Sequence, residues 1–329
     1  MVFFDWRGAF FALTSAMLLS ASAAAQNATF PEEGKDITFI CISAAGGPTD
    51  AATRVLAESV SKALGKQIIV DVKAGANGAI GLGALVRSEP DGHTLAIGGY
   101  SVATTTWLRP DSQVTFDGDD FEPIATFMSD PVILAVPASS PYQNLADFVA
   151  AAKAKPKAIR AGTTGYLGTS AFVGMLLEDA AGISLTLVPF TGSAGTVAAL
   201  AGNQIEAGFV TTTPALPLVQ SGQLRILAYF DDSKELEAFP GLKSAIDQGF
   251  DVNYPVVTGL FAPAGTPPEV LQFWSDQVGR AMEDKEFVTK LSHVGTPVFQ
   301  DLGKIRSFWK TMQENTRNLV ALAEKRPKD

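Results

Sequence analysis

The sequence predicts an α/β protein with two lobes, each a sheet flanked by helices. The chain has 329 residues, 47% of them hydrophobic, which is enough for one large domain or two ordinary ones. Short apolar segments alternate with helix-like segments along most of the chain. This alternation is typical of β-α-β units and of a parallel sheet with helices on both faces. Two stretches, 122–131 and about 251–260, are candidates for chain crossings between the lobes.

Three short apolar runs open the predicted first lobe: DITFICI, QIIVDV and HTLAIGG. A helix is expected after each of the first two, and AATRVLAESVSKAL is the clearer of these helices. We therefore expect strands at 36–42, 67–72 and 93–99, and helices at about 48–64 and 77–87.

The middle of the chain repeats this scheme with PVILAVP, AIRAG, SLTLVPF, IEAGFV and LRILAYF as strands. The first three are followed by helix-like segments, namely 144–154, TSAFVGMLLEDAAG and SAGTVAALAGN. The last part has a predicted strand at 256–263 and a helical stretch from Pro268 that breaks near Asp284. An amphipathic helix from about Leu302 to Lys325 ends the chain.

The expected crossings define the lobe boundaries. Lobe 1 would comprise residues 26–128 and 255–329, and lobe 2 would comprise residues 129–254. Residues 1–25 have the features of a signal peptide. AFFALTSAMLLSA is too short to span a bilayer comfortably, and the small residues ASAAA offer a cleavage site after Ala25. A buried N-terminal helix is the alternative, whereas a signal peptide predicts an exported protein.

Composition excludes several classes of function. The net charge is −9 and no basic stripe is visible, so nucleic acid is not an expected partner. The single cysteine, Cys41, builds neither a disulfide nor a cysteine zinc site. The chain has two histidines, His93, expected to be a partly exposed turn residue, and His293 near a helix end. No nucleophile elbow, H-E-x-x-H pair or Walker A loop occurs, and the glycines of 73–84 do not fit a dinucleotide fingerprint. We therefore expect no catalytic residues, no metal and no cofactor.

Four loops share one design, because each joins a strand to a helix and is rich in Gly, Ser, Thr or Asn. They are AAGGPTD (44–50), AGANG (74–78), GTTGYLGTS (162–170) and PFTGSAGT (189–196). The first N–H groups of a helix lack internal partners, and the helix dipole adds partial positive charge there. Several such ends that face one cleft would bind an anion without Arg or Lys. The alternative is that each loop is only a tight turn with a helix cap.

Asp50, at the end of the first loop, has two possible roles. Its carboxylate either accepts a hydrogen bond from water or a ligand hydroxyl, or lies in the first turn of the helix and pairs with Arg54 at i+4. The structural role is the favoured one.

The order of these motifs resembles a known family. A GG-x-x-D turn, a G-x-x-G turn and a P-D-G-x-T turn follow one another within DITFICISAAGGPTDAATRVLAESVSKALGKQIIVDVKAGANGAIGLGALVRSEPDGHTLAIGG. AGTTGYLGTS, VPFTGSAGTVAALAGNQIEAG and GLFAPAGTPPEVL match later signatures. Over nearly the whole mature chain the sequence is similar to the extracytoplasmic receptors of tripartite tricarboxylate transporters, the Bug (Bordetella uptake gene) family.

This resemblance implies a periplasmic binding protein of the two-lobed Venus-flytrap type, type II-like, that is not an enzyme. The receptor would close on a small carboxylate and deliver it to a membrane permease with one large and one small subunit. We expect it to be a monomer. The resemblance places ligand contacts at Ala45, Gly46, Gly47, Thr49, Asp50, Gly75, Ala76, Asn77 and Gly78 in lobe 1, and at Thr163, Thr164, Gly168, Thr169, Ser170, Thr191 and Gly192 in lobe 2.

Two other functions share these features. A periplasmic module that presents its ligand to a sensor would have the same pocket, and an exported enzyme acting on a carboxylate is the other alternative. Four aromatic residues either line an apolar part of the pocket or belong to the core: Tyr100, Trp107, Tyr166 and Phe190.

Overall fold

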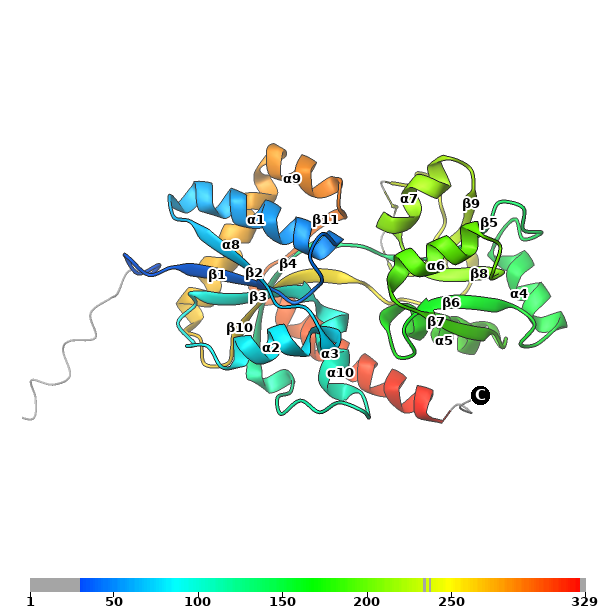
Figure 1. Cartoon of the computed structure of the whole chain (residues 1–329), viewed down its shortest axis with the longest axis horizontal. Coiled ribbons are helices and arrows are strands. Elements are labelled where there is room, and N and C mark those ends of the chain that lie inside the picture. Colours follow the sequence, from blue (N-terminus) through cyan, green and yellow to red (C-terminus); the bar gives the residue numbers. More distant parts are fainter. Residues whose placement is uncertain (1–29, 233–234, 237, 326–329) are drawn as a thin grey trace, which may run out of the picture. The chain divides into compact units, whose positions relative to one another are not determined.

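Two sheets organise the computed structural model, which describes residues 30–232, 235–236 and 238–325 (Figure 1). The predicted signal peptide lies outside the described residues. The first sheet has the order β11-β4-β10-β3-β1-β2. Its strands are β1 (Ile37–Cys41), β2 (Ile68–Val72), β3 (Thr94–Gly99), β4 (Phe121–Ser129), β10 (Val257–Pro263) and β11 (Thr296–Gln300).

The second sheet has the order β7-β6-β8-β5-β9. Its strands are β5 (Val132–Pro137), β6 (Arg160–Thr164), β7 (Thr186–Phe190), β8 (Ala207–Thr211) and β9 (Leu224–Tyr229). All strands of this sheet come from the chain between β4 and β10. From Asp36 onward the chain forms one compact unit that contains both sheets.

Both sheets are mixed, so the prediction of parallel sheets is wrong for part of each. β1 runs parallel to β2 and β3, but β10 is antiparallel to β3 and β4. In the second sheet β6 is parallel to β7 and β8, whereas β5 is antiparallel to β8 and β9. The chain leaves the first sheet at the end of β4 and enters it again at the start of β10. This reversal of direction gives the antiparallel pairs.

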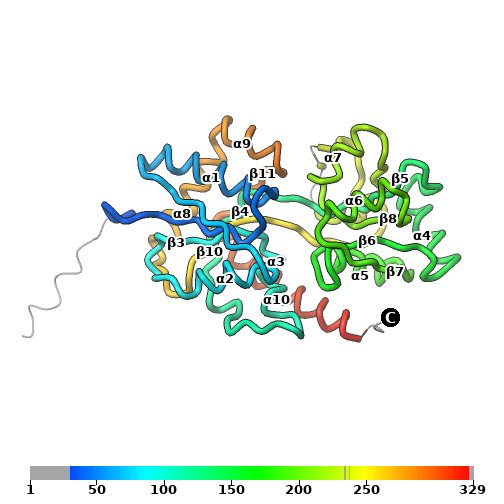
Figure 2. The backbone as a smooth tube through the Cα atoms, in the orientation of Figure 1, coloured from blue at the N-terminus to red at the C-terminus, as the bar shows by residue number. Residues whose placement is uncertain are grey.

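The helices follow the strands as predicted at most places. They are α1 (Pro48–Leu64), α2 (Ala79–Val86), α4 (Leu145–Ala154), α5 (Thr169–Ala181), α6 (Gly192–Ala201), α8 (Pro268–Glu283), α9 (Lys285–Ser292) and α10 (Leu302–Glu324). Figure 1 shows α1 and α9 on one side of the first sheet and α2 and α3 on the other. Figure 2 shows α1 beside α9, which lies more than 200 residues later, and Lys290 of α9 binds Glu58 of α1 at 2.8 Å.

Two α-helices and two strands of the described residues were not predicted. They are the helices α3 (Tyr100–Leu108) and α7 (Thr212–Gln220) and the strands β4 and β11. The segment 122–131, expected to be a crossing, is mostly β4, and the crossing itself falls at Asp130. There the Asp130 N–H donates to the Val256 carbonyl at 3.0 Å, so the outgoing and returning chains are bonded to each other.

The core consists of separate apolar clusters around the two sheets. Trp274 of α8 is fully buried against Phe39, with ring centroids 5.5 Å apart. α10 contributes to two clusters, because Trp309 packs with residues of the first sheet while Leu319 and Val320 pack with residues of the second. Cys41 is fully buried in β1 and is a free thiol.

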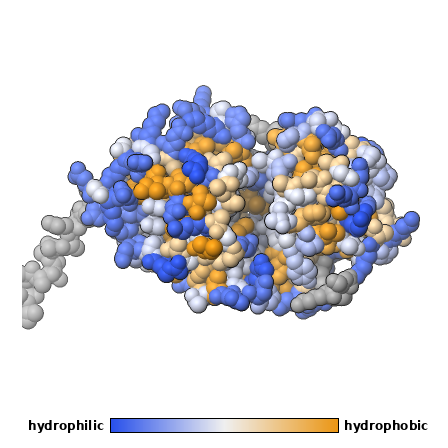
Figure 3. Space-filling model, viewed as in Figure 1, coloured by the Kyte–Doolittle hydropathy of each residue, from blue (hydrophilic) through white to orange (hydrophobic). Residues whose placement is uncertain are grey.

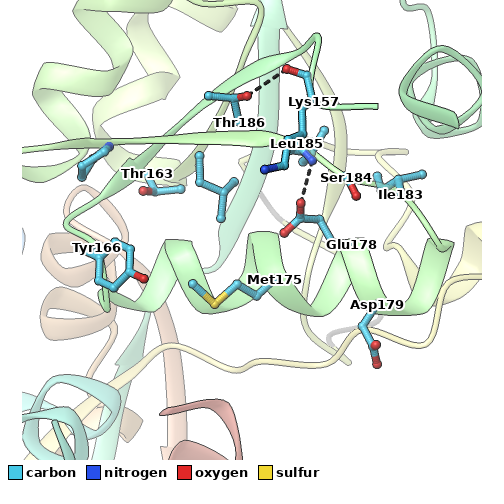
Figure 4. Close-up of a pocket in the computed structure, with 12 residues that line it drawn as sticks. Lys157, Thr163, Tyr166, Met175, Glu178, Asp179, Ile183, Ser184, Leu185 and Thr186 are labelled. Carbon is cyan, nitrogen blue, oxygen red and sulfur yellow. Dashed lines mark hydrogen bonds between the residues drawn. The ribbon is translucent and has the colours of Figure 1, made fainter. Parts of the chain in front are cut away.

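β7 is an edge strand of the second sheet. The Thr186 N–H and the Phe190 carbonyl face β6, since they bond to Ile159 and Gly165 respectively. The Leu185 N–H faces the other way and donates to Oε1 of Glu178 at 2.6 Å (Figure 4).

The surface carries few large apolar side chains. On the face drawn in Figure 3, small hydrophobic groups are interspersed with hydrophilic residues. Among the described residues the large hydrophobic side chains that are exposed are Ile69, Ile80, Tyr166, Ile246 and Phe299. None of the described helices has the length and apolar character that crossing a bilayer requires.

Candidate functional site

Six of the described helices follow strands β1 to β3 and β6 to β8, and the predicted loops lie at four of their junctions. Helices α1, α2 and α3 follow β1, β2 and β3, while α5, α6 and α7 follow β6, β7 and β8. In α/β sheets, ligands bind outside the carboxyl ends of the strands, where such helices start. The geometry of each junction decides which hydrogen-bond donors remain available.

The first junction, before α1, uses both of its glycine N–H groups internally. The Gly46 N–H donates to Oδ2 of Asp50 at 2.8 Å, and the Gly47 N–H donates to the Ala44 carbonyl at 3.2 Å. Gly46 has a φ of 76°, which favours glycine. Pro48 has no N–H, so Thr49 and Asp50 supply the first N–H groups of α1 that lack a partner within the helix. Ala45 is exposed at the tip of this turn.

Asp50 has the structural role that the sequence favoured. Its buried carboxylate accepts from Gly46 and also pairs with Nε of Arg54 at 3.0 Å, one turn along α1. Burial alone raises the pKa of Asp50, but the Gly46 N–H and the Arg54 guanidinium outweigh it and hold the pKa below its ordinary value. Both carboxylate oxygens are therefore engaged by the protein.

We expect Asp50→Asn to lower the free energy of unfolding by about 1–2 kcal/mol at neutral pH, because a hydrogen bond to a charged acceptor is weakened. A depressed pKa means that this contribution is complete above the unfolded pKa of about 3.9. It is lost as pH falls through the folded pKa. Urea unfolding of both proteins between pH 7 and pH 3 measures the difference. Asp111→Asn, which removes an exposed Asp–Arg pair, should change stability little at any pH, and a difference that grows on acidification would contradict the role of Asp50.

The second junction is a short left-handed turn. Gly75, Ala76, Asn77 and Gly78 have φ values of 126°, 46°, 55° and 89° in succession. The Gly78 N–H closes the turn on the Gly75 carbonyl at 3.0 Å. Gly78 is buried, whereas the other three residues are exposed.

The α5 junction is held by hydroxyl groups. The Thr164 N–H donates to Oγ of Ser170 at 2.7 Å, and the two side-chain oxygens lie 2.8 Å apart. Thr163, which is buried, donates to the Gly165 carbonyl at 3.1 Å. Gly168 is the N-cap of α5, and a Cβ there would overlap the carbonyl oxygen of Thr164. The structure therefore brings Thr164, Gly168 and Ser170 together in one compact loop.

The α6 junction is more open. Thr191 and Gly192 are both exposed, and Gly192 has a φ of 79°. The Thr191 side chain makes no capping hydrogen bond to α6. Its hydroxyl and the first N–H groups of α6 are thus placed where a ligand can reach them.

Sequence reasoning missed the contribution of α3. Thr169, in the first turn of α5, donates through its hydroxyl to Oγ of Ser101 at 3.1 Å. Ser101 lies in the first turn of α3 and is fully buried. This contact joins two helix N-termini that belong to different sheets. The signal available in the sequence was Gly98-Gly99 at the end of a predicted strand, the same pattern that marks the α1 junction.

The α7 junction already holds a carboxylate. Oδ1 of Asp130 accepts from the Thr212 hydroxyl at 2.5 Å and from the Thr213 N–H at 3.2 Å. Burial raises the pKa of Asp130, against the opposing effect of these hydrogen bonds. The helix start is thereby occupied by the residue at which the chain crosses from β4 to β5.

Positive side chains are absent from the junction loops. Residues 43–50, 74–79, 99–103, 162–170 and 189–196 contain no Lys, Arg or His. Arg54, one turn beyond the first loop, is paired with Asp50. Any anion bound by these loops must therefore be held by N–H groups, hydroxyls and helix dipoles.

A cavity of about 510 Å³ lies between α5 and β7 (Figure 4). Thr163 and Tyr166 line one end, next to the α5 junction, and Glu178 and Asp179 lie toward the other end of the helix. Of the predicted site residues, Thr163 belongs to this cavity.

The aromatic candidates divide between core and surface. Tyr100 is fully buried and donates to the Leu260 carbonyl at 3.0 Å, and Trp107 stacks on Phe121 with ring centroids 5.6 Å apart. Tyr166 is half exposed.

His93 is buried, not partly exposed as predicted, because its turn lies against the first sheet and its carbonyl bonds to the Thr38 N–H. The described residues contain no cluster of His, Cys, Asp or Glu suited to a metal ion.

The fold is that of periplasmic solute-binding proteins. A TctC solute-binding protein from Polaromonas superposes with a TM-score of 0.78 at 25% identity, over 91% of this chain and 100% of that one. MatC from Rhodopseudomonas palustris with bound malate gives 0.71 at 23% identity, over 88% and 99% of the two chains. An R. palustris protein with adipate gives 0.75 at 22% identity, over 89% and 98%.

The chain belongs to the tripartite tricarboxylate transporter receptor family, TctC, whose model matches residues 52–326. Among curated relatives, the UPF0065 protein in the gbd 5′ region of Cupriavidus necator is 32% identical, over 83% of this chain and 82% of that protein. Protein BugT of Bordetella pertussis is 27% identical, over 80% and 81%. The chain is thus a solute-binding receptor of this family and not an enzyme, and the resemblance read from its sequence is confirmed.

Proposed function

We propose that this receptor binds a small carboxylate between the junction loops of its two sheets and delivers it to a membrane permease with a large and a small subunit. The observation that carries this proposal is the Ser101–Thr169 hydrogen bond at 3.1 Å. It links the first turns of α3 and α5, so two helix starts from different sheets lie together. A carboxylate there would accept from the unpaired N–H groups of several helices.

The proposed contacts are those that the family resemblance assigned, with the roles refined by geometry. Gly46, Gly47 and Asp50 shape the first turn, and the N–H groups of Thr49 and Asp50 are the donors. The other proposed contacts are Ala45, Gly75, Ala76, Asn77, Gly78, Thr163, Thr164, Gly168, Thr169, Ser170, Thr191 and Gly192.

A dicarboxylate is the first ligand class to test. The structures of the same fold described above hold malate and adipate, which differ in length and in hydroxylation. The loops of this chain carry no cation, so each carboxylate must be neutralised by helix dipoles that supply about half a charge each. The net charge of −9 repels an anion at long range, so these local dipoles must supply the attraction that binds it.

We further propose that lobe 1 comprises 26–128 and 255–329 and lobe 2 comprises 129–254, that the protein is a monomer, and that residues 1–25 export it to the periplasm. The division of strands between the sheets supports these lobe boundaries. Amino-terminal sequencing of protein purified from the periplasm should give Gln26 as the first residue. A start at Met1 would contradict export by cleavage.

A thermal-shift screen of the exported protein tests the ligand class. We expect malate, adipate or another carboxylate to raise the melting temperature. A ligand at 100 times its dissociation constant adds about 2.7 kcal/mol to the stability of the folded state. The dimethyl ester of the same acid, which keeps the carbon chain but lacks the charge, is the control and should give no shift.

Two results would contradict the proposal. Equal shifts with acid and ester would exclude carboxylate recognition. No shift with any acid, repeated after unfolding and refolding to remove a trapped ligand, would exclude the carboxylate class altogether.

A further inference from the structure

The left-handed turn at 75–78 holds two residues in an unfavourable backbone conformation. Ala76 and Asn77 are non-glycine residues with positive φ, and the other two among the described residues, Lys157 and Asn203, are isolated. Such a conformation persists only where the surrounding structure enforces it. Since Ala76 and Asn77 are exposed, packing of their side chains does not supply this constraint.

Two threonines of α3 hold the turn from outside. The Asn77 amide donates from Nδ2 to Oγ1 of Thr105 at 3.0 Å, and the Thr106 hydroxyl donates to the Asn77 carbonyl at 2.6 Å. The side-chain amide and the main-chain carbonyl of Asn77 are thus both held by one helix. Thr105 and Thr106 are buried, so water does not compete for these groups from the helix side.

The same helix also reaches the second sheet. The Thr105 hydroxyl lies within hydrogen-bond distance of the Ser101 carbonyl, at 3.0 Å, and of the Val102 carbonyl, at 2.9 Å. Oγ of Ser101 accepts from Thr169 of α5. Contacts between neighbouring residues thus connect Asn77 through Thr105 and Ser101 to Thr169.

We propose that Thr105 and Thr106 are positioning residues for ligand binding: they hold Asn77, and with it the left-handed turn, in the conformation that receives the carboxylate. This inference rests on the proposed function, because it assumes that the turn contacts the ligand. It adds two residues, on a helix that the family motifs do not include.

The test compares three isosteric variants of the full-length exported protein, with malate and adipate as probes. Thr105→Val and Thr106→Val each remove one hydrogen bond to Asn77, and the double variant removes both. Each bond is worth a few-fold in affinity, so the double variant should bind roughly tenfold more weakly. Thr104→Val is the matched control. Thr104 is equally buried on α3, but its hydroxyl bonds to Ser101 and Thr316 and does not touch the turn.

Two further readouts separate positioning from a general structural role. In an Asn77→Gly background, glycine adopts the left-handed conformation without support, so Thr105→Val should no longer weaken binding. Amide exchange at Gly78, whose N–H closes the turn, should quicken in the double variant but not in Thr104→Val. This second readout needs no ligand.

The outcomes distinguish the two proposals. Affinity equal to that of Thr104→Val, with unchanged exchange at Gly78, would overturn the positioning role. Faster exchange with unchanged affinity would show that the turn is held by α3 but does not serve binding, which also overturns it. If the wild-type protein binds no carboxylate, the proposed function fails, and the positioning role in binding fails with it.

Discussion

Gly168→Ala should lower the affinity for the carboxylate by roughly 100-fold, the effect expected when two hydrogen bonds to a charged ligand are lost. Gly168 has no room for a side chain, because a Cβ would overlap the carbonyl oxygen of Thr164. That oxygen belongs to the backbone of β6 and cannot rotate away. The loop that holds Thr164 and Ser170 must therefore move, and the first N–H groups of α5 move with it. Calorimetric titration with the acid found in the screen measures the loss.

Gly47→Ala is the control for this experiment. Gly47 is also an N-cap with extended backbone, at φ −81°, and a Cβ there would lie 3.3 Å from the Ala44 carbonyl, which a small adjustment relieves. We expect less than a few-fold change in affinity. Should both variants bind equally weakly, steric exclusion at Gly168 would not be the cause.

Gly259→Ala should cause the largest loss of stability, at least about 3 kcal/mol, which is the range of severe overpacking in a core. Gly259 lies in β10, between β3 and β4. An added Cβ would overlap the Ala125 carbonyl oxygen of β4 and lie 2.6 Å from the ring of Tyr100. The ring cannot retreat, because it packs against Phe261 at 4.4 Å and its hydroxyl is bonded to Leu260. Urea unfolding of the purified protein measures the loss, and failure to accumulate in the periplasm is its extreme form.

Gly279→Ala is the matched control, because it adds the same methyl group at a position that can accommodate it. Gly279 lies inside α8, and the nearest atom to an added Cβ is the far end of the Phe299 ring, at 3.2 Å. Because alanine favours the helix over glycine by about 1 kcal/mol, this variant should be neutral or slightly stabilised. Equal destabilisation by both variants would show that the space around Gly259 is not what matters.

The predicted elements that the structure reproduces best have clear terminal signals. α1 begins at Pro48, as the preorganised φ of proline favours, and ends before Gly65, which has a φ of 62°. The missed elements lack such signals. α3 has three consecutive threonines, which are poor helix formers, and α7 contains Pro217. Their helical state comes from tertiary contacts, such as the hydroxyl bonds of α3, that no local pattern encodes.

The loops of the candidate site were predictable from the sequence, but the N–H groups that remain available to a ligand were not. Gly46 and Gly47 marked the first turn correctly, yet both of their N–H groups are used within the turn. Spacing in the sequence cannot show which N–H groups a turn uses itself. Ser101 was missed for a related reason, since its contact with Thr169 joins residues 68 positions apart.

The edge strand β7 affects the tendency of the protein to aggregate at high concentration. Successive residues of a strand face opposite ways, so Leu187 and Pro189 present their backbone to the outside, as Leu185 does. Glu178 already takes the Leu185 N–H, and Pro189 has none, which leaves the Leu187 N–H as the donor on this side of the strand. An incoming strand would thus find one N–H donor along this edge, with the donors on either side of it removed. Together with α5, whose Glu178 takes the Leu185 N–H, this loss of donors protects the edge against strand-to-strand aggregation.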